Sequence, residues 1–180
     1  NDKDRTVIGN PFPKATWGIS NTFRWKGFDL YFLIQGVSGL DVFNGDGYYT
    51  ESKKFNRNYV KDRWISAEYP GDGRTPTVGS AGISWEFTDY MIEDGSFVAL
   101  RDVVLGYTFD KKKLKKAGLN SLRLYASGQN LLYFWGKSYR GINPEARVTT
   151  GSYSSPLVNG YQRGGFPIQS TVNIGFELNF

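Results

Sequence analysis

The last eleven residues of the chain, 170–180, alternate strictly between polar and apolar side chains. They read S-T-V-N-I-G-F-E-L-N-F, so the apolar residues from Val172 to Phe180 fall on one parity. In an extended strand the two sets point to opposite faces. A membrane-spanning β-strand needs about ten residues of this pattern, because its outer face meets lipid and its inner face meets a polar lumen. An amphipathic strand at the edge of a soluble sandwich shows the same alternation, so this stretch alone leaves both interpretations open.

The alternation recurs earlier in the chain. Residues 15–25 place an apolar side chain at every position of one face from Trp17 to Trp25, except Asn21. For a strand tilted by about 40°, the distance between the two tryptophans corresponds to about 20 Å along the membrane normal. This is close to the height of an outer-membrane apolar band with its aromatic girdles. The recurrence therefore favours a membrane β-barrel over a soluble sandwich.

The pattern predicts five antiparallel strands that are joined by connections of very different length. We expect the strands at residues 15–25, 28–36, 96–109, 121–131 and 170–180. Short turns at 26–27 and 110–120 alternate with long loops at 1–14, 37–95 and 132–169. Outer-membrane barrels have short periplasmic turns and longer extracellular loops. The prediction is an all-β chain, in one transmembrane β-barrel domain over residues 1–180, with its C-terminus in the periplasm.

Five strands cannot close a barrel, and an open sheet edge in lipid would leave backbone groups without hydrogen-bond partners. The chain also opens without a signal-peptide-like apolar run, so we expect it to come from a longer precursor.

Around Arg101 the alternation breaks, which predicts a β-bulge or a stretch outside the bilayer. The residues that we expect to face lipid or to form the aromatic girdles are Trp17, Trp25, Phe28, Phe32, Tyr107, Phe109, Ile174, Phe176 and Phe180.

The composition argues against an enzyme and against a nucleic-acid-binding protein. The chain has no histidine and no cysteine, so the usual general bases, activated nucleophiles and zinc ligands are missing, and we expect no cofactor. The formal net charge is +5, but one run supplies it, and the rest of the chain balances 17 basic against 17 acidic residues. This run either binds anionic lipid headgroups or is an ordinary solvated turn. It comprises Lys111, Lys112, Lys113, Lys115 and Lys116.

Two groups of loop residues are candidates for binding. Aromatic side chains in the first long loop could stack on sugar rings or contact a partner protein, or could pack the loop on itself; they are Trp64, Trp85, Tyr48, Tyr49, Tyr59 and Tyr69. Carboxylates could form a Ca²⁺ site, although their spacing matches no known loop and a solvated surface is the alternative. These are Asp41, Asp46, Asp89, Glu93 and Asp94.

Several short motifs, in a fixed order, resemble those of the SusC/RagA-like TonB-dependent outer-membrane transporters of the Bacteroidota. Residues 7–11 (V-I-G-N-P) and 26–30 (K-G-F-D-L) resemble the family's loop, strand and hairpin signature. Arg63-Trp64 with Glu68-Tyr69-Pro70 resembles the R-W-x-x-E-N-P motif, with Tyr69 in place of Asn. The remaining motifs are residues 92–97 (I-E-D-G-S-F), 105–108 (L-G-Y-T), 127–131 (S-G-Q-N-L) and 141–145 (G-I-N-P-E).

This resemblance implies the last five strands of a large plugged barrel of the 22-stranded type. Such transporters import oligosaccharides or peptides with energy delivered through TonB, which would act on an upstream part of the parent chain. A SusD-like surface lipoprotein covers the barrel. Phe180 would be the terminal aromatic residue that the barrel-assembly machinery recognises. The implied location is the outer membrane of a Gram-negative bacterium, with the long loops extracellular.

Two other functions stay open on the sequence alone. The first is a secreted carbohydrate-binding β-sandwich, in which the apolar faces would form a buried core. The second is a glycosidase fragment, which needs two carboxylates about 5 to 10 Å apart across a cleft. Asp102 and Glu177 are the carboxylates considered for such a pair, and nothing beyond their presence in the sequence supports it.

Overall fold

The structure is a computed structural model that describes residues 5–45, 63–73, 75, 77, 89–115, 118–146, 160–162 and 165–180. The chain divides into two compact units. The sheet unit comprises Ala15–Val37, Phe97–Phe134 and Ile168–Phe180, and the loop unit comprises Asn1–Lys14, Ser38–Ser96 and Trp135–Pro167. Within the described residues, no helix has the length and apolar character needed to cross a bilayer.

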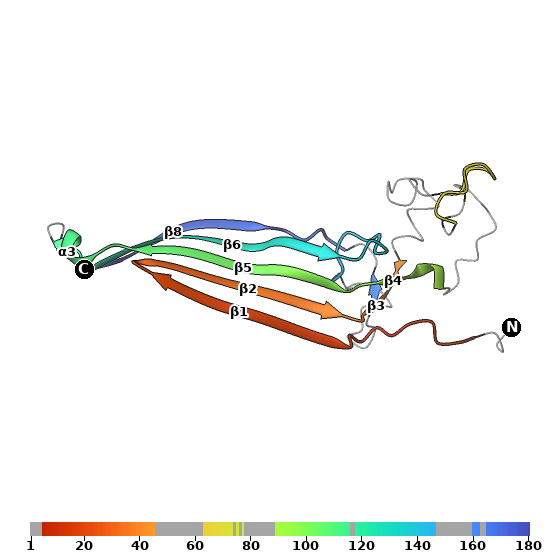
Figure 1. The fold of residues 1–180 in the computed structure, drawn as a ribbon, viewed down its shortest axis with the longest axis horizontal. Helices are drawn as coiled ribbons and strands as arrows, with labels where there is room; N and C mark the ends of the chain where they lie inside the picture. Colours follow the sequence, from red (N-terminus) through yellow and green to blue (C-terminus); the bar gives the residue numbers. More distant parts are fainter. Residues whose placement is uncertain are drawn as a thin grey trace. The chain divides into compact units, whose positions relative to one another are not determined.

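Five long strands form one sheet, in the order β1-β2-β5-β6-β8 (Figure 1). The pairs β2/β5 and β6/β8 are antiparallel. Each strand has one apolar face, and this period of two residues fits a strand and not a helix. The predicted all-β class and the five-stranded sheet are therefore confirmed. The bounds are β1 Ala15–Trp25, β2 Phe28–Ser38, β5 Phe97–Thr108, β6 Ser121–Trp135 and β8 Thr171–Asn179.

Two of these strands extend further than the sequence pattern indicated. The strand expected to end at residue 36 continues to Ser38, and the strand expected to end at residue 131 continues to Trp135. In β6 the reason is Asn130, whose φ of 52° lies in the left-handed region. This conformation interrupts the regular pleat, so the side-chain alternation is lost while the strand continues. The long loop assigned to residues 132–169 therefore begins later than predicted.

The connections also contain short elements that the sequence analysis missed. Residues 37–95 include β3 (Asp41–Asn44), the 3₁₀ turn η2 (Asp89–Met91) and β4 (Ile92–Asp94). In the loop unit, β3 pairs antiparallel with β4 and parallel with β7 (Tyr161–Gln162). The turn at 110–120 contains the helix α3 (Lys111–Leu114), which Asp110 caps by accepting from the Lys112 N–H at 2.8 Å. Elements of two to four residues are too short to show a periodicity.

The bulge expected near Arg101 is present. Leu33 pairs with Asp102, whereas Ile34 pairs with Leu100, so the register shifts and Arg101 is the extra residue on β5. A bulge turns neighbouring side chains away from their alternating positions. This explains why charged and apolar residues occur on both parities in this part of the sequence.

A tight hairpin joins β1 to β2 at Lys26 and Gly27. Both residues have positive φ, 46° and 88°, as a two-residue turn of type I′ requires. The carbonyl of Gly27 also accepts a hydrogen bond from the Thr108 N–H at 2.8 Å, which ties the hairpin to the end of β5. The hairpin and α3 therefore lie at the same end of the sheet (Figure 1).

Candidate functional site

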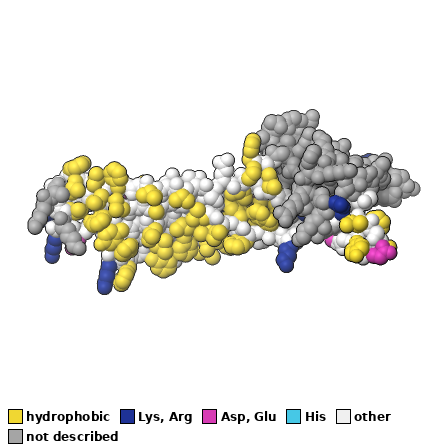
Figure 2. All heavy atoms as spheres, turned by 90° about the horizontal axis from the view of Figure 1, so that it is seen from above, with side chains coloured by type: hydrophobic (Ala, Val, Ile, Leu, Met, Phe, Trp, Pro, Cys, Tyr) yellow, Lys and Arg dark blue, Asp and Glu magenta, His cyan; other side chains and the backbone are white. Residues whose placement is uncertain are grey.

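One face of the five-stranded sheet is apolar and open to its surroundings. Paired strands place apolar residues opposite each other, as Leu30 opposite Leu105 and Leu124 opposite Phe176 show. Ile174 is 86% exposed and Phe176 is 66% exposed. Figure 2 shows hydrophobic side chains gathered along the sheet. A continuous exposed apolar surface calls for a nonpolar environment, and the buried core that a soluble sandwich would require does not form on this face.

Aromatic residues cluster at the hairpin end of this face. The rings of Phe28 and Tyr107 have centroids 4.6 Å apart, and those of Tyr107 and Phe109 are 4.9 Å apart. Trp25 lines the same end, and the ammonium of Lys26 lies 4.9 Å from the centre of its ring. We call Trp25, Phe28, Tyr107 and Phe109 the aromatic end cluster. Further along the face, the rings of Phe23 and Phe32 stack at 6.2 Å, and Trp17 covers Gly36.

The opposite face carries an ion cluster that spans four strands. Arg123 of β6 binds Asp29 of β2 through Nη2–Oδ2 at 2.7 Å and Nε–Oδ1 at 3.2 Å. It also binds Glu177 of β8 through Nη1–Oε1 at 3.0 Å. Because β5 lies between β2 and β6, the guanidinium passes over Gly106, the β5 residue that pairs with Asp29. Arg123 is thereby held between two carboxylates.

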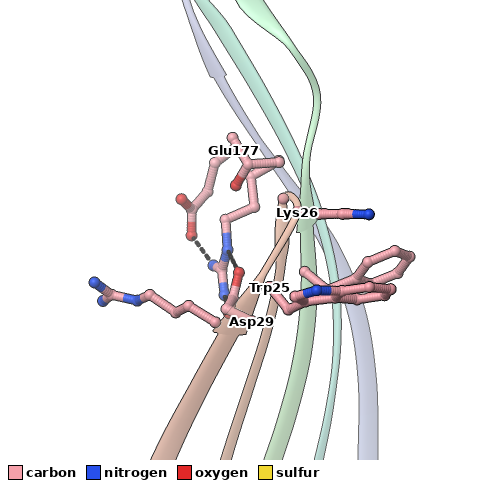
Figure 3. Close-up of a pocket in the computed structure, with 9 residues that line it drawn as sticks. Trp25, Lys26, Asp29 and Glu177 are labelled. Atoms are coloured by element: carbon pink, nitrogen blue, oxygen red, sulfur yellow. Dashed lines mark hydrogen bonds and ion pairs between the residues drawn. The ribbon is translucent and has the colours of Figure 1, made fainter.

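An open depression of about 570 Å³ surrounds the hairpin end of the sheet. In Figure 3, Lys26 and the ring of Trp25 point away from the carboxylates of Asp29 and Glu177. At this end of the sheet, Lys26 and the Trp25 ring thus lie on one side of the strands, and the carboxylates of Asp29 and Glu177 lie on the other. Its lining comprises Arg24, Trp25, Lys26, Gly27, Phe28, Asp29, Thr108, Arg123 and Glu177.

A second polar cluster surrounds Arg101 at the bulge. Its Nε donates to Gln35 Oε1 at 2.7 Å, and its Nη1 donates to Asn130 Oδ1 at 3.3 Å and to the Tyr133 hydroxyl. The guanidinium also lies over the rings of Tyr133 and Phe97, at 5.3 and 5.7 Å. The sequence indicated the bulge but not these partners, which come from three different strands.

In the loop unit, a buried carboxylate organises two of the motifs seen in the sequence. Glu93 is 4% exposed and accepts from Arg140 Nε at 2.7 Å and from the Arg140 backbone N–H at 2.8 Å. Asn44 Nδ2 donates to the same carboxylate at 3.0 Å. Arg140 directly precedes the G-I-N-P-E motif, and Glu93 belongs to I-E-D-G-S-F. The buried Glu93 carboxylate therefore joins the I-E-D-G-S-F motif to the residue that precedes the G-I-N-P-E motif.

Three of the candidate calcium ligands make other contacts, although Asp41 and Asp94 lie opposite each other in the β3/β4 pair. Glu93 holds Arg140, Asp41 accepts from the Asn10 N–H at 2.8 Å, and Asp94 accepts from the Ser96 N–H at 2.9 Å. Asp46 lies outside the described residues. In the part of the chain that the structure describes, no group of three acidic side chains is placed to hold a metal ion.

Of the six loop aromatics, the structure describes Trp64 and Tyr69. They are 44% and 70% exposed, at the two ends of a turn in which the Tyr69 N–H donates to the Ser66 carbonyl at 3.0 Å. The Ser66 hydroxyl donates to Glu68 at 2.8 Å, and this hydrogen bond lowers the pKa of the carboxyl below its ordinary value. The other four, Tyr48, Tyr49, Tyr59 and Trp85, lie outside the described residues.

No family model matches the chain, but individual relatives do. The TonB-dependent receptor P3 of Formosa agariphila is 33% identical over 98% of this chain. The TonB-dependent receptor P26 of the same organism is 28% identical, and the TonB-dependent receptor SusC of Bacteroides thetaiotaomicron is 24% identical, each over 98% of this chain. The chain spans only 16 to 18% of the length of these curated relatives.

Solved structures share the fold. The RagAB peptide importer in its open-open state matches 97% of this chain with a TM-score of 0.70 at 22% identity, and the match covers 18% of that structure's chain. The closed-closed state matches equally well, at 21% identity. The five-stranded sheet is thus a sheet of the RagAB type, with the family motifs in its strands and connections. Taken together, the chain is similar over 98% of its length to TonB-dependent receptors, SusC among them, and it shares the fold of the RagAB structures.

Proposed function

We propose that this chain is part of the barrel wall of an outer-membrane importer that is driven through TonB and takes up oligosaccharides or peptides. The observation that carries the proposal is the contrast between the two faces of the sheet. One face is apolar and exposed, as lipid contact requires, and the other carries the ion cluster and the Arg101 cluster, as a polar lumen requires. The named relatives, which are receptors and importers, support this assignment.

The orientation and the partners are part of the proposal. The hairpin end of the sheet faces the periplasm, because short turns lie there, and the loop unit lies outside the cell. A SusD-like lipoprotein covers that side, and Trp64 and Tyr69 are exposed for contact with this protein or with substrate. TonB acts through parts of the parent chain beyond these residues.

Growth and purification experiments on the full-length receptor test the function. Deletion of its gene should abolish growth on a specific oligosaccharide or peptide source while growth on a simple monomer continues. The tagged receptor should fractionate with the outer membrane, migrate in a heat-modifiable manner on a gel, and purify with a surface lipoprotein. If the receptor were recovered from the soluble fraction, the barrel function would be wrong.

Phe180 keeps its proposed role as the aromatic residue that the assembly machinery recognises. Phe180→Ala in the full-length receptor should reduce the amount of heat-modifiable protein in the outer membrane. Phe166→Ala is the matched control, because Phe166 is as exposed as Phe180, at 84%. An equal loss in both variants would contradict a specific role for Phe180.

A further inference from the structure

Lys26 occupies a backbone conformation that does not suit it. Its φ of 46° lies in the left-handed region, which Asn, Asp and Gly adopt far more readily than a lysine. The type I′ turn would form more easily with Asn at this position. A residue that is held in an unfavourable conformation suggests a function for its side chain.

The side chain of Lys26 lies on the apolar side of the sheet. Its ammonium is 4.9 Å from the centre of the Trp25 ring, and Figure 3 shows both directed away from Asp29 and Glu177. The carboxylates of Asp29 and Glu177 are held by Arg123 on the opposite face. Lys26 therefore places a positive charge directly beside the aromatic end cluster.

Further lysines lie in the connection that follows β5 at the same end of the sheet (Figure 1). The helix α3 begins two residues after Phe109, whose ring contacts Tyr107. Leu114 is buried and fixes the helix, while Lys111, Lys112 and Lys115 are exposed. The Asp110 carboxylate accepts from the Lys112 N–H. The Thr108 N–H donates to the carbonyl of Gly27, so the hairpin is tied to the end of β5, three residues before α3 begins. Figure 2 shows basic side chains beside the hydrophobic surface at this end.

We propose that Lys26 and the exposed lysines of α3 form, with the aromatic end cluster, a binding site for an anionic phospholipid. The acyl chains would lie on the apolar face, the glycerol region at the level of Trp25 and Phe28, and the phosphate against the lysine ammonium groups. Aromatic rings prefer this depth of a bilayer, and lysines near its surface attract anionic headgroups. The inference rests on the proposed function, which places this end of the sheet at the periplasmic leaflet.

Stepwise lipid binding to the detergent-purified, full-length receptor tests the site. Native mass spectrometry during titration with dioleoylphosphatidylglycerol gives the association constant of the most tightly bound lipid molecule on the receptor. We expect Lys26→Asn to lower this constant about fivefold, since a lysine near an anionic surface contributes roughly this factor. Lys26→Arg should retain binding, and changing Lys111, Lys112 and Lys115 together to Gln should lower it further. Dioleoylphosphatidylcholine should bind more weakly and should not respond to Lys26→Asn.

A matched control separates a site from a general charge effect. Lys14 directly precedes β1, whereas Lys26 directly follows it, so Lys14→Asn removes the same charge at the other end of the strand. If Lys14→Asn and Lys26→Asn weakened binding equally, or if neither did, the site would be wrong. Because Asn suits the turn, Lys26→Asn should keep the heat-modifiable migration of the receptor. If the receptor imports substrate but binds the anionic lipid no more tightly than dioleoylphosphatidylcholine, the lipid site is wrong and the importer function stands. The importer function is tested separately, by growth of the gene deletion strain.

Discussion

Arg123 of β6 forms an ion pair with Asp29 of β2 although β5 lies between their strands. The pair can form because β5 presents Gly106 at the crossing point. A methyl group at residue 106 would lie 2.6 Å from Asp29 Oδ1 and 2.7 Å from Arg123 Nη2. The glycine of the L-G-Y-T motif is thus explained by the side chains that pass over it.

The first prediction concerns this crossing. Gly106→Ala should push the Arg123 and Asp29 side chains apart and destabilise the full-length barrel by up to about 1 kcal/mol, the range of a partly exposed ion pair. The midpoint temperature at which the compact gel band disappears measures the effect. Gly18→Ala is the control, because a methyl group there would lie 3.8 Å from the nearest atom, the Ile34 carbonyl oxygen. Equal midpoint temperatures for the two variants would show that the space above Gly106 does not contribute to the stability of the barrel.

The second prediction distinguishes the two faces of β8. Ile174 lies on the exposed apolar face, and its neighbour Asn173 lies on the other face, opposite Ser127. Ile174→Arg should destabilise the barrel by about 2–4 kcal/mol, because the charge would enter lipid near the bilayer midplane. Asn173→Arg should have little effect, since the charge would stay in a polar lumen. Urea unfolding of the receptor in vesicles compares the two. Similar losses for both would contradict the assignment of a lipid face.

The faces of the strands could be read from the sequence because alternation is a local property. A side chain such as Ile174 points to the same side of its strand whichever strands flank it. The bulge at Arg101 was readable for the same reason, since it leaves charged and apolar residues on both parities. The part of β6 that follows Asn130 could not be predicted from the sequence. The positive φ of Asn130 interrupts the alternation of polar and apolar side chains on which the prediction depends.

The clusters depend on which strands are neighbours, and this the sequence does not reveal. The Arg123–Asp29 pair joins residues 94 positions apart, and the Glu93–Arg140 pair joins residues 47 positions apart. Each side chain by itself resembles a solvated surface charge. From the sequence, Glu93 is accordingly a candidate calcium ligand. In the structure its side chain is buried and binds Arg140. The glycine at 106 was the one readable sign of the first pair, since a strand interior rarely favours glycine.

The third prediction concerns the buried pair in the loop unit. Glu93→Gln removes the buried negative charge that Arg140 contacts through Nε and its backbone N–H, and the loss of one member of a buried pair costs about 3–5 kcal/mol. We expect faster amide hydrogen exchange in Asp41–Asn44 and Ile92–Asp94 of the full-length receptor. Asp94→Asn is the control, because Asp94 is exposed and Asn can still accept from the Ser96 N–H. Unchanged exchange in Glu93→Gln would mean that the pair does not hold the two strands together.

The fourth prediction asks whether Glu93 also binds calcium. Because Arg140 and Asn44 already occupy its oxygens, a chelator should not change hydrogen exchange in β3 and β4 of the wild-type receptor. The experiment compares exchange with and without excess EDTA at constant ionic strength. Faster exchange of β4 in EDTA would restore Glu93 as a metal ligand and would make the ion pair with Arg140 a property of the metal-free protein.

The last prediction concerns Trp17 and Gly36 on the apolar face. The indole of Trp17 covers Gly36 so closely that a methyl group at residue 36 would overlap the ring. Gly36→Ala must therefore move the indole away from the sheet, whereas the same change in a Trp17→Ala background meets no ring. The two changes should be coupled by about 0.5–3 kcal/mol in a double-mutant cycle on the melting of the compact band. If Gly36→Ala has the same effect in both backgrounds, residue 36 is a glycine for a reason other than the contact with Trp17.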